Sequence, residues 1–375
     1  MRILVTGGAG FIGSHTCDRL VELGHDVIVL DALTAPVHRG RQPNYRTPGA
    51  DLVVGDVRNR DLVANLLRRV DAVYHFAAYQ DYLPDFATFT DVNVTSTALL
   101  YEIIVAERLE LSRVVVASSQ AAMGEGLYEC PDHGEQTPDM RPLSALEQSR
   151  WDLTCPVCGG EVEMCRTPER IANPQNAYGM SKHAEEVVAV NLGRRYGIPT
   201  VALRYSIVQG PRQSVYNAYS GACRIFCLHY LQGSAPTLYE DGQAIRDYIN
   251  IHDVVDANLL VLSDDRAAGR VFNVGGGTGY PTEQFADIVR RQYGSDEPGR
   301  INGEYRFGDT RHILSDIGAL SQLGWAPRRT PADSVAEYAA WLEGMPGLGE
   351  ILAGAEAKMR ALGVVRKAQL MTRTQ

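Results

Sequence analysis

The chain has 375 residues, 45% of them hydrophobic, which is enough for a large core and two lobes. Its net charge of −9 argues against nucleic acid or an anionic membrane as a partner, and no apolar run approaches the roughly 20 residues of a membrane-spanning helix. Because Met1 leads directly into a strand-like segment, we expect no signal peptide and a cytoplasmic location. Seven cysteines are too few and too clustered for a secreted disulfide scaffold.

The start of the chain has the pattern of a βαβ unit. An apolar strand at 2–6 is followed by a glycine-rich turn, a helix that ends at Gly24, and a second strand at 27–30. Glycines at such a turn let the backbone approach a pyrophosphate, and the helix N-terminus offers N–H groups to the phosphates. An acid after the second strand would bind the ribose 2′-hydroxyl and repel a 2′-phosphate, so the pattern favours NAD over NADP. The candidate cofactor-binding residues here are Gly7, Gly10, Phe11, Ile12, Gly13 and Asp31, while the nearby Arg39 and Arg41 are interpreted as surface charge.

The alternation of strands and helices continues along the chain. Strands are expected at 51–55, 72–78 and 113–117, and helices at 61–69 and 91–109. Short hydrophobic strands that alternate with helices predict an α/β fold with a doubly wound parallel sheet of the Rossmann type. Ligands of such sheets bind beyond the carboxyl ends of the strands. Residues expected near a cofactor on these segments are Asp56 and Val57 beside an adenine, the strand end at Phe76, Ala77 and Ala78, and Asn93.

Ser119 follows the strand at 113–117, at the edge where ligands of a parallel sheet bind. Its hydroxyl could orient a reacting group. A helix-capping or turn serine is an equally ordinary interpretation of this position.

Between 126 and 172 the alternation of strands and helices is interrupted, and two similar five-residue motifs occur there. Cys130-Pro-Asp-His133-Gly and Cys155-Pro-Val-Cys158-Gly each place two potential ligands three positions apart beside a proline and a glycine. Two such knuckles about 20 residues apart predict a tetrahedral Cys₃His zinc site, and because the protein fills all four positions the zinc would be structural. The alternatives are free loop cysteines, or Cys165 as a substitute ligand. We expect a small zinc-binding insertion beside the active site.

A helix beginning near Tyr178 places Tyr178 and Lys182 four positions apart on one face. A phenol with an ordinary pKa near ~10 is a poor base at neutral pH, but a neighbouring ammonium favours the phenolate. The pair can therefore supply a general base, although alone it would more often be a solvated helix face.

The rest of the chain predicts a further strand at 200–205, a helix near 222–227 whose Cys223 and Cys227 pack in the core, a helix from His252, and a last sheet strand at 271–274. Helices near 282–293, 315–323 and 331–343 build a smaller lobe, followed by a peripheral helix. The expected division is a cofactor-binding domain at 1–204, with the insertion at 126–172 and its last elements at 247–274, a substrate lobe at 205–246 and 275–345, and a C-terminal tail at 346–375.

Taken together, the glycine turn, Asp31, Ser119 and the Tyr178-x-x-x-Lys182 pair resemble the extended branch of the short-chain dehydrogenase/reductase family, the nucleotide-sugar epimerases and dehydratases. The resemblance runs from Met1 to about Pro327, interrupted by the insertion. It implies that Tyr178 is the base, that Lys182 holds the nicotinamide ribose and that Ser119 hydrogen-bonds the reacting hydroxyl. It also implies a nucleotide-diphosphate sugar as substrate and a homodimer as the assembly. The substrate-binding residues that it implies are Arg246 and Arg311, which would grip the diphosphate, together with Gln80, Ser119, Gln213 and Asn217.

Four positions depart from the patterns of this branch. The 4,6-dehydratases carry Asp-Glu after the catalytic hydroxyl residue, where this chain has Gln120 and Ala121. Galactose-type epimerases have an asparagine where this chain has Ile207, and a family lysine is replaced by Gln80. The paired knuckle is similar to a subgroup of 4-epimerases of deoxysugars such as dTDP-L-rhamnose.

The sequence thus predicts an isomerase, an NAD-dependent nucleotide-sugar 4-epimerase that acts through a transient 4-keto sugar. The alternatives are a 4-ketosugar reductase or an oxidative decarboxylase of the same family, and, in a different class, a catalytically silent NAD-sensing protein whose zinc insertion binds a partner.

Overall fold

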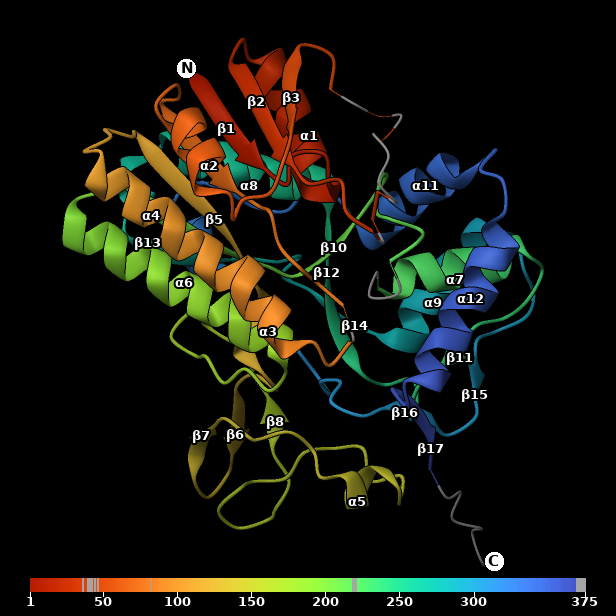
Figure 1. The fold of residues 1–375 in the computed structure, drawn as a ribbon. Helices are drawn as coiled ribbons and strands as arrows, with labels where there is room; N and C mark the ends of the chain where they lie inside the picture. Colours follow the sequence, from red (N-terminus) through yellow and green to blue (C-terminus); the bar gives the residue numbers. More distant parts are fainter. Residues whose placement is uncertain are drawn as a thin grey trace, which may run out of the picture.

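A computed structural model gives the fold shown in Figure 1, and it describes residues 1–35, 37–38, 43, 45, 47–81, 83–217 and 221–368. Arg39 and Arg41, interpreted above as surface charge, lie outside these residues. A seven-stranded sheet forms the centre of the molecule, in the order β13-β9-β5-β4-β1-β2-β3, with every pair parallel. Its strands are β1 (Arg2–Thr6), β2 (Asp26–Asp31), β3 (Ala50–Val54), β4 (Ala72–His75), β5 (Arg113–Ser119), β9 (Thr200–Tyr205) and β13 (Arg270–Val274). The predicted doubly wound parallel sheet is confirmed.

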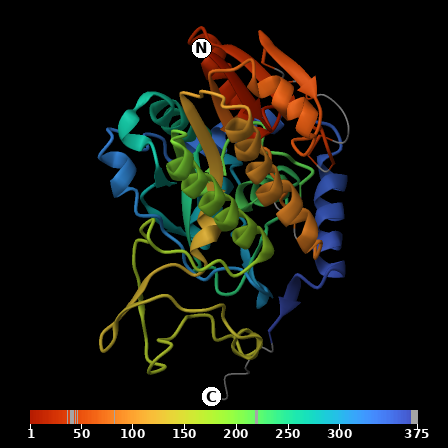
Figure 2. The same cartoon turned by 60° about the vertical axis from the view of Figure 1, so that its left-hand side comes forward.

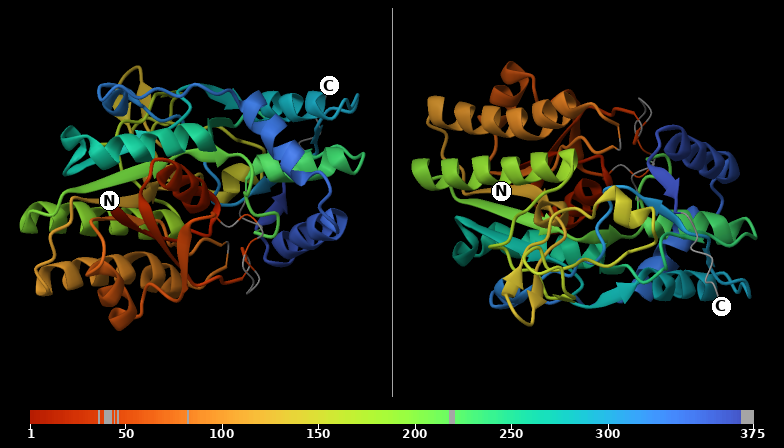
Figure 3. Two further views of the ribbon diagram at one scale, coloured as in Figure 1. Left: turned by 90° about the horizontal axis from the view of Figure 1, so that it is seen from above. Right: turned by 90° about the horizontal axis from the view of Figure 1, so that it is seen from below.

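Helices cover both faces of the sheet, as Figure 3 shows from above and below. One face packs on α1 (Phe11–Glu22) and α8 (Ile251–Ser263), and the other on α2 (Arg60–Leu67), α4 (Ser96–Ala106) and α6 (Ala177–Tyr196). Alternate residues of each central strand point to opposite faces, so Val115 and Val116 on β5 belong to different hydrophobic clusters. Burial on both faces explains why these strands are continuous apolar runs.

Three expected elements differ in extent. The helix expected over 91–109 consists of α3 (Phe86–Phe89), a π-helical turn at Thr90–Thr95 and α4. The strand expected over 72–78 ends at His75, because the N–H groups of Phe76 and Ala77 donate to the Thr6 hydroxyl, each at 3.2 Å. The helix expected over 315–323 is only α10 (Gly318–Ser321), since the chain around Ser315 is extended and forms a β-bridge with Thr167.

The insertion lies beyond the carboxyl ends of the strands, below the sheet in Figures 1 and 2. Its regular elements are β6 (Tyr128–Cys130), β7 (Gly134–Gln136), β8 (Glu163–Met164) and the short helix α5 (Leu143–Leu146). The three strands pair antiparallel in the order β7-β6-β8. Most of the insertion is irregular chain, so it depends on something other than backbone pairing for its shape.

The remaining elements build a second lobe with its own hydrophobic cluster, centred on Phe226, Phe285 and Tyr338. Its helices are α7 (Ala222–Leu231), α9 (Thr282–Gln292), α11 (Pro331–Leu342) and α12 (Leu348–Ala361). Its small sheets contain β10 (Ile207–Gln209), β12 (Ile245–Asn250) and β14 (Gly279–Pro281), then β11 (Thr237–Leu238) with β15 (Arg300–Ile301), and β16 (Glu304–Arg306) with β17 (Val365–Lys367). The pairing of β17 with β16 ties the end of the described chain to the lobe.

In the described parts of the chain, no helix combines the length and the apolar character that crossing a membrane would require.

Candidate active site

A cavity of about 500 Å³ lies between the carboxyl ends of the central strands and the second lobe. Residues at or just beyond the ends of four strands contribute to its wall: Gly7 after β1, Phe76 after β4, Ser119 on β5 and Tyr205 on β9. The size is typical of a cavity for a small molecule or cofactor, and the location is the one expected for ligands of a parallel sheet.

The glycine turn forms one end of this cavity. A Cβ at Gly13 would lie 2.3 Å from the Gly7 carbonyl oxygen, and a Cβ at Gly7, whose φ is +68°, would lie 2.7 Å from the Ala77 nitrogen. These glycines therefore allow the close packing of turn, helix and strand that a dinucleotide-binding loop requires. Predicted cofactor residues that line the cavity are Gly7, Gly10, Phe11, Ile12, Gly13, Phe76, Ala78, Tyr178 and Lys182.

Asp31 lies at the end of β2, where its carboxylate accepts the backbone N–H groups of Ala9 at 3.1 Å and Leu33 at 2.9 Å. It thus helps to fix the glycine turn. No basic partner closer than the 3.9 Å to His38 is found for this carboxylate in the described residues. Its negative charge stands at the position where the βαβ pattern places an acid for the ribose.

The other predicted cofactor residues lie behind the cavity wall. The Asp56 carboxylate is paired with Arg58 at 2.6 Å, and Val57 is buried in the core. The Asn93 amide accepts from the Tyr79 N–H at 2.7 Å and donates to Ser181 at 2.9 Å, so it ties the loop after β4 to α6. Ala77 is the second residue after β4, and its backbone N–H donates to the Thr6 hydroxyl. None of these four residues lines the cavity.

Ser119, Tyr178 and Lys182 meet at the cavity wall. Asn176 caps α6 by accepting from the Gly179 N–H at 2.8 Å, and Gly179 packs so closely that a Cβ there would lie 2.4 Å from the Ala121 carbonyl oxygen. This contact brings the first turn of α6 against the end of β5. Ser119 accepts from the Ala121 N–H at 3.1 Å, so the expected capping role and the contact with Tyr178 occur together.

The electrostatics around the phenol are mixed. Burial raises the pKa of Tyr178, whereas the Lys182 ammonium and the hydrogen bond from Ser119 lower it. Lys182 is only 1% exposed and lies on the same helix face one turn away. The cluster can therefore hold a phenol whose proton is exchanged with a ligand in the cavity.

On the opposite side, the predicted residues Gln80, Gln213, Asn217 and Arg246 line the cavity. The Arg246 guanidinium donates to the carbonyl oxygens of Thr310 at 2.8 Å and of Arg311 at 3.0 Å, and it lies 3.4 Å from the Asp309 carboxylate. These contacts fix its orientation while it still faces the cavity.

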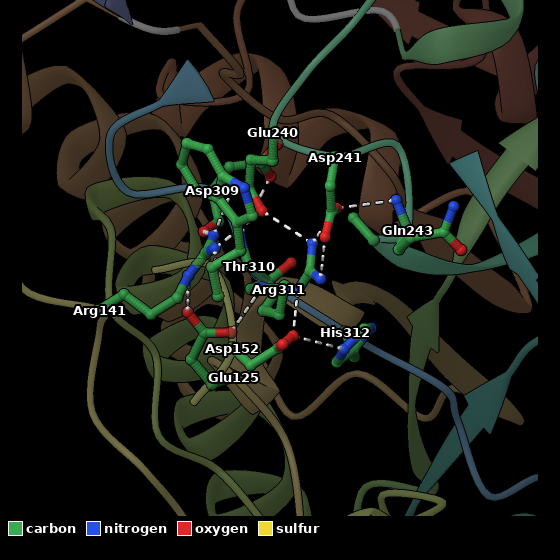
Figure 4. Close-up of polar contacts among 12 residues, drawn as sticks. Glu125, Arg141, Asp152, Glu240, Asp241, Gln243, Asp309, Thr310, Arg311 and His312 are labelled. Atoms are coloured by element: carbon green, nitrogen blue, oxygen red, sulfur yellow. Dashed lines mark hydrogen bonds and ion pairs between the residues drawn. The ribbon is translucent and has the colours of Figure 1, made fainter. Parts of the chain in front are cut away.

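Arg311, which the resemblance implies would grip the diphosphate, is not among the residues that line this cavity. Figure 4 shows its guanidinium among carboxylates, with bonds to Asp241 at 2.7 and 2.8 Å, Asp152 at 2.8 Å and Glu240 at 3.1 Å. Because the side chain is 2% exposed, its charge needs these partners, and they occupy its donors. The arrangement assigns Arg311 to holding segments of the protein together.

Two other arginines of the second lobe, Arg306 on β16 and Arg360 on α12, line the cavity and were missed from the sequence. The neighbouring Tyr305 is buried, so strand alternation turns Arg306 to the opposite side. A recognisable strand at 304–306 would have identified it. Arg360 is paired with Glu304 at 2.8 Å and could not be placed from sequence, because its helix belongs to the C-terminal tail.

The four predicted metal ligands come together in the insertion. The Cys130 Sγ lies 3.6 Å from the His133 Nδ1 and 3.8 Å from the Cys158 Sγ, and the Cys155 Sγ lies 3.8 Å from the same His133 nitrogen. With Zn–S bonds of about 2.3 Å, sulfur ligands at the corners of a tetrahedron would be about 3.8 Å apart. The donor set and its separations therefore fit a zinc ion. Cys165 is outside the group, and its thiol donates to the Glu163 carbonyl oxygen.

Comparison with known proteins identifies the family. The sequence profile of the NAD dependent epimerase/dehydratase family matches residues 3–148 and 155–275. A dTDP-L-rhamnose 4-epimerase of Burkholderia thailandensis is 31% identical over 348 residues, which cover 91% of this chain and 94% of the relative.

Two solved structures also resemble the chain. UDP-glucose 4-epimerase of Thermotoga maritima with UDP-glucose is 26% identical with a TM-score of 0.74, covering 91% of this chain and 98% of that one. UDP-glucose 4-epimerase of Thermus thermophilus in complex with NAD is 27% identical with a TM-score of 0.72, covering 92% and 99%. The resemblance stated from the sequence is confirmed: the chain belongs to the NAD dependent epimerase/dehydratase family, in the extended branch of the short-chain dehydrogenases/reductases.

Proposed function

We propose that this protein is an NAD-dependent nucleotide-sugar 4-epimerase. The observation that carries the proposal is that Ser119, Tyr178 and Lys182 line the same cavity as the glycine turn, so a cofactor and a reacting hydroxyl can lie side by side. The relatives named as 4-epimerases support it. NAD, when bound, supplies reversible acceptance of a hydride, and the 2′-hydroxyl of its adenosine ribose would be held by Asp31.

The residues of the chain move the proton. The Tyr178 phenolate takes the proton of the C4 hydroxyl as the carbon becomes a ketone, and it returns the proton when the opposite configuration forms. Ser119 donates to the same oxygen and orients it, and Lys182 stabilises the phenolate and holds the nicotinamide ribose. Between the two half-reactions the 4-keto sugar must present its other face, so the chain must grip the substrate away from the sugar.

Arg246 and Arg306 are proposed to provide that grip. Both face the cavity from the second lobe, and a guanidinium binds a phosphate by two parallel hydrogen bonds. Arg306 takes the place first given to Arg311. Gln80, Gln213 and Asn217 would contact the rest of the nucleotide sugar.

The neighbours of Ser119 favour epimerisation over loss of water from the sugar. Gln120 and Ala121 stand where a 4,6-dehydratase carries an acid and a base, and the Gln120 amide oxygen accepts a hydrogen bond from Ser206 at 3.2 Å. An amide and a methyl group cannot exchange the protons that dehydration requires.

We further propose that Cys130, His133, Cys155 and Cys158 hold one structural zinc ion. The insertion has three short strands and many irregular residues, so a metal would supply the stability that its small core cannot. Zinc at one end and the buried charges around Arg141 and Arg311 at the other would hold the insertion against the second lobe. Met140 of the insertion lines the cavity, which connects this support to the substrate.

The domain division expected from the sequence belongs to the same proposal: the cofactor is bound by 1–204 and 247–274, and the substrate by 205–246 and 275–345. We also propose a homodimer formed through α4 and α6. Met180 and Val187, on the outer face of α6, are exposed apolar side chains that such a contact would cover.

The test of the reaction is incubation with a panel of nucleotide sugars without added NAD, followed by NMR of the products. We expect one substrate to be inverted at C4, because the cofactor is regenerated in each cycle and stays bound. Turnover only with added NAD(P)H, in stoichiometric amounts, would instead identify a reductase and contradict the proposal.

Tyr178→Phe should bind NAD normally and lose at least about a hundredfold in kcat, because the ring stays while the proton acceptor is lost. The matched control is Tyr196→Phe, at the exposed end of the same helix, which should retain wild-type turnover. Comparable activity of Tyr178→Phe and wild type would remove Tyr178 from the mechanism.

Elemental analysis of the purified protein should give about one zinc per chain. Cys158→Ser should lose the metal and lower the melting temperature, whereas Cys165→Ser should keep both, since Cys165 lies outside the cluster. A zinc content near zero in the wild-type protein would refute the structural-zinc proposal.

Arg306→Gln and Arg311→Gln should have different effects, the first on substrate binding and the second on stability. Removing a charge-assisted bond to the diphosphate should raise KM of the nucleotide sugar about tenfold to a hundredfold in Arg306→Gln, with little change in stability. Arg311→Gln should remove the ion pairs with Asp241 and Glu240 and lower the melting temperature, while Glu240 keeps its pair with Arg141. Thermal denaturation and initial-rate kinetics separate the two, and a stable Arg311→Gln protein with a raised KM would restore the clamp role to Arg311.

A further inference from the structure

Glu185 is a buried acid that the proposed reaction does not use. It lies on α6 three residues after Lys182, and its Oε2 is 2.5 Å from the Lys182 Nζ. Lys182 is 1% exposed and Glu185 is 0% exposed, so both charges are withdrawn from water. A buried pair of this kind gains little or no net stability over an apolar pair of similar volume, because desolvation offsets the attraction. The charges of the pair act more directly on the neighbouring titratable groups, Tyr178 among them.

The other titratable groups around the pair come from three elements, and at neutral pH each is either uncharged or paired with an opposite charge. Burial lowers the pKa of His75 on β4 to about 3, with the Lys182 charge acting in the same direction. Burial also raises the pKa of Tyr101 on α4. Glu186, the next residue of α6, is neutralised by Arg204 through bonds of 2.7 and 2.8 Å. Lys182 and Glu185 therefore dominate the charge that reaches Tyr178.

These two charges act on the phenol in opposite directions. After burial, which raises the pKa of Tyr178, the Lys182 ammonium lowers it and the Glu185 carboxylate raises it again. The pKa of Glu185 is itself raised to about 7, chiefly by burial and against the influence of Lys182. The contact with the Lys182 ammonium favours the carboxylate form of Glu185.

We propose that Glu185 is a positioning residue for the Tyr178–Lys182 pair: its carboxylate holds the Lys182 ammonium in place and limits the positive charge that the phenol experiences. This inference rests on the proposed function, because it concerns the base of that reaction. Glu185 acts through Lys182. Its charge raises the pKa of Tyr178, so the phenolate is a stronger base but forms only at a higher pH.

The direct test is an ultraviolet titration of Tyr178. Tyrosinate absorbance is followed against pH in the protein as purified, and the curve of the same protein carrying Tyr178→Phe is subtracted. Glu185→Gln and Glu185→Met both remove the charge at similar volume, so the Tyr178 midpoint should fall by about 0.5 to 1 pH unit. The rising limb of kcat/KM should move to lower pH by the same amount. Glu185→Asp, which keeps the charge, should keep a midpoint close to that of the wild type.

The matched control is Glu186→Gln. It removes a neighbouring buried carboxylate from the same helix and should lower thermal stability through the loss of the Arg204 pair, without moving the Tyr178 midpoint. An unchanged or higher midpoint in both uncharged Glu185 variants would overturn the proposal. So would folding of Glu185→Asp alone among the three, since the charge would then serve the fold. The titration requires no turnover, so absence of epimerase activity would refute the proposed function without deciding this result.

Discussion

The candidate site depends on the packing of the first turn of α6 against the end of β5. Gly179 lies against the Ala121 carbonyl oxygen without room for a Cβ, and this contact sets Tyr178 beside Ser119. Two turns further along the helix, Glu186 accepts hydrogen bonds from Ser118 on β5 at 2.8 Å and from Arg204 on β9. The helix is therefore fixed at a polar strand edge as well as by its apolar face. A phenol and an ammonium held this way need no movement to meet a substrate.

Ion pairs connect the insertion to the second lobe beside the cavity. Arg141 of the insertion is 2% exposed and binds Glu240 and the Asp309 carbonyl oxygen, while Arg311 joins Asp241 and Asp152. Removing one buried partner of such a network would leave a charge uncompensated, so these pairs favour the contact between the insertion and the second lobe. Under the zinc proposal, the cysteine and histidine cluster would support the other end of the insertion.

Much of this arrangement could be predicted from the sequence, because the signals were local. The glycine turn and the helix from Tyr178 lie where periodicity places them, and the two knuckles bring their four side chains together. The interactions that the sequence did not indicate are non-local. Arg311 lies near Gly308 and Asp309 in sequence, but four acids from distant segments surround it, and no pattern near position 311 indicates them. Arg306 and Arg360 reach the cavity only through the pairing of β16 with β17 and the packing of the C-terminal helix.

The central claim is that the configuration at C4 is inverted through a 4-keto sugar. The hydride that leaves C4 when the ketone forms returns to C4 within the same site. The most direct measurement is epimerisation of a nucleotide sugar carrying deuterium at C4, in ordinary water, with the product analysed by NMR and mass spectrometry. The account predicts that the C4 deuterium is retained in the inverted product, because the cofactor returns what it removed. Loss of the deuterium to solvent would show that C4 is inverted by proton exchange, and it would contradict the account.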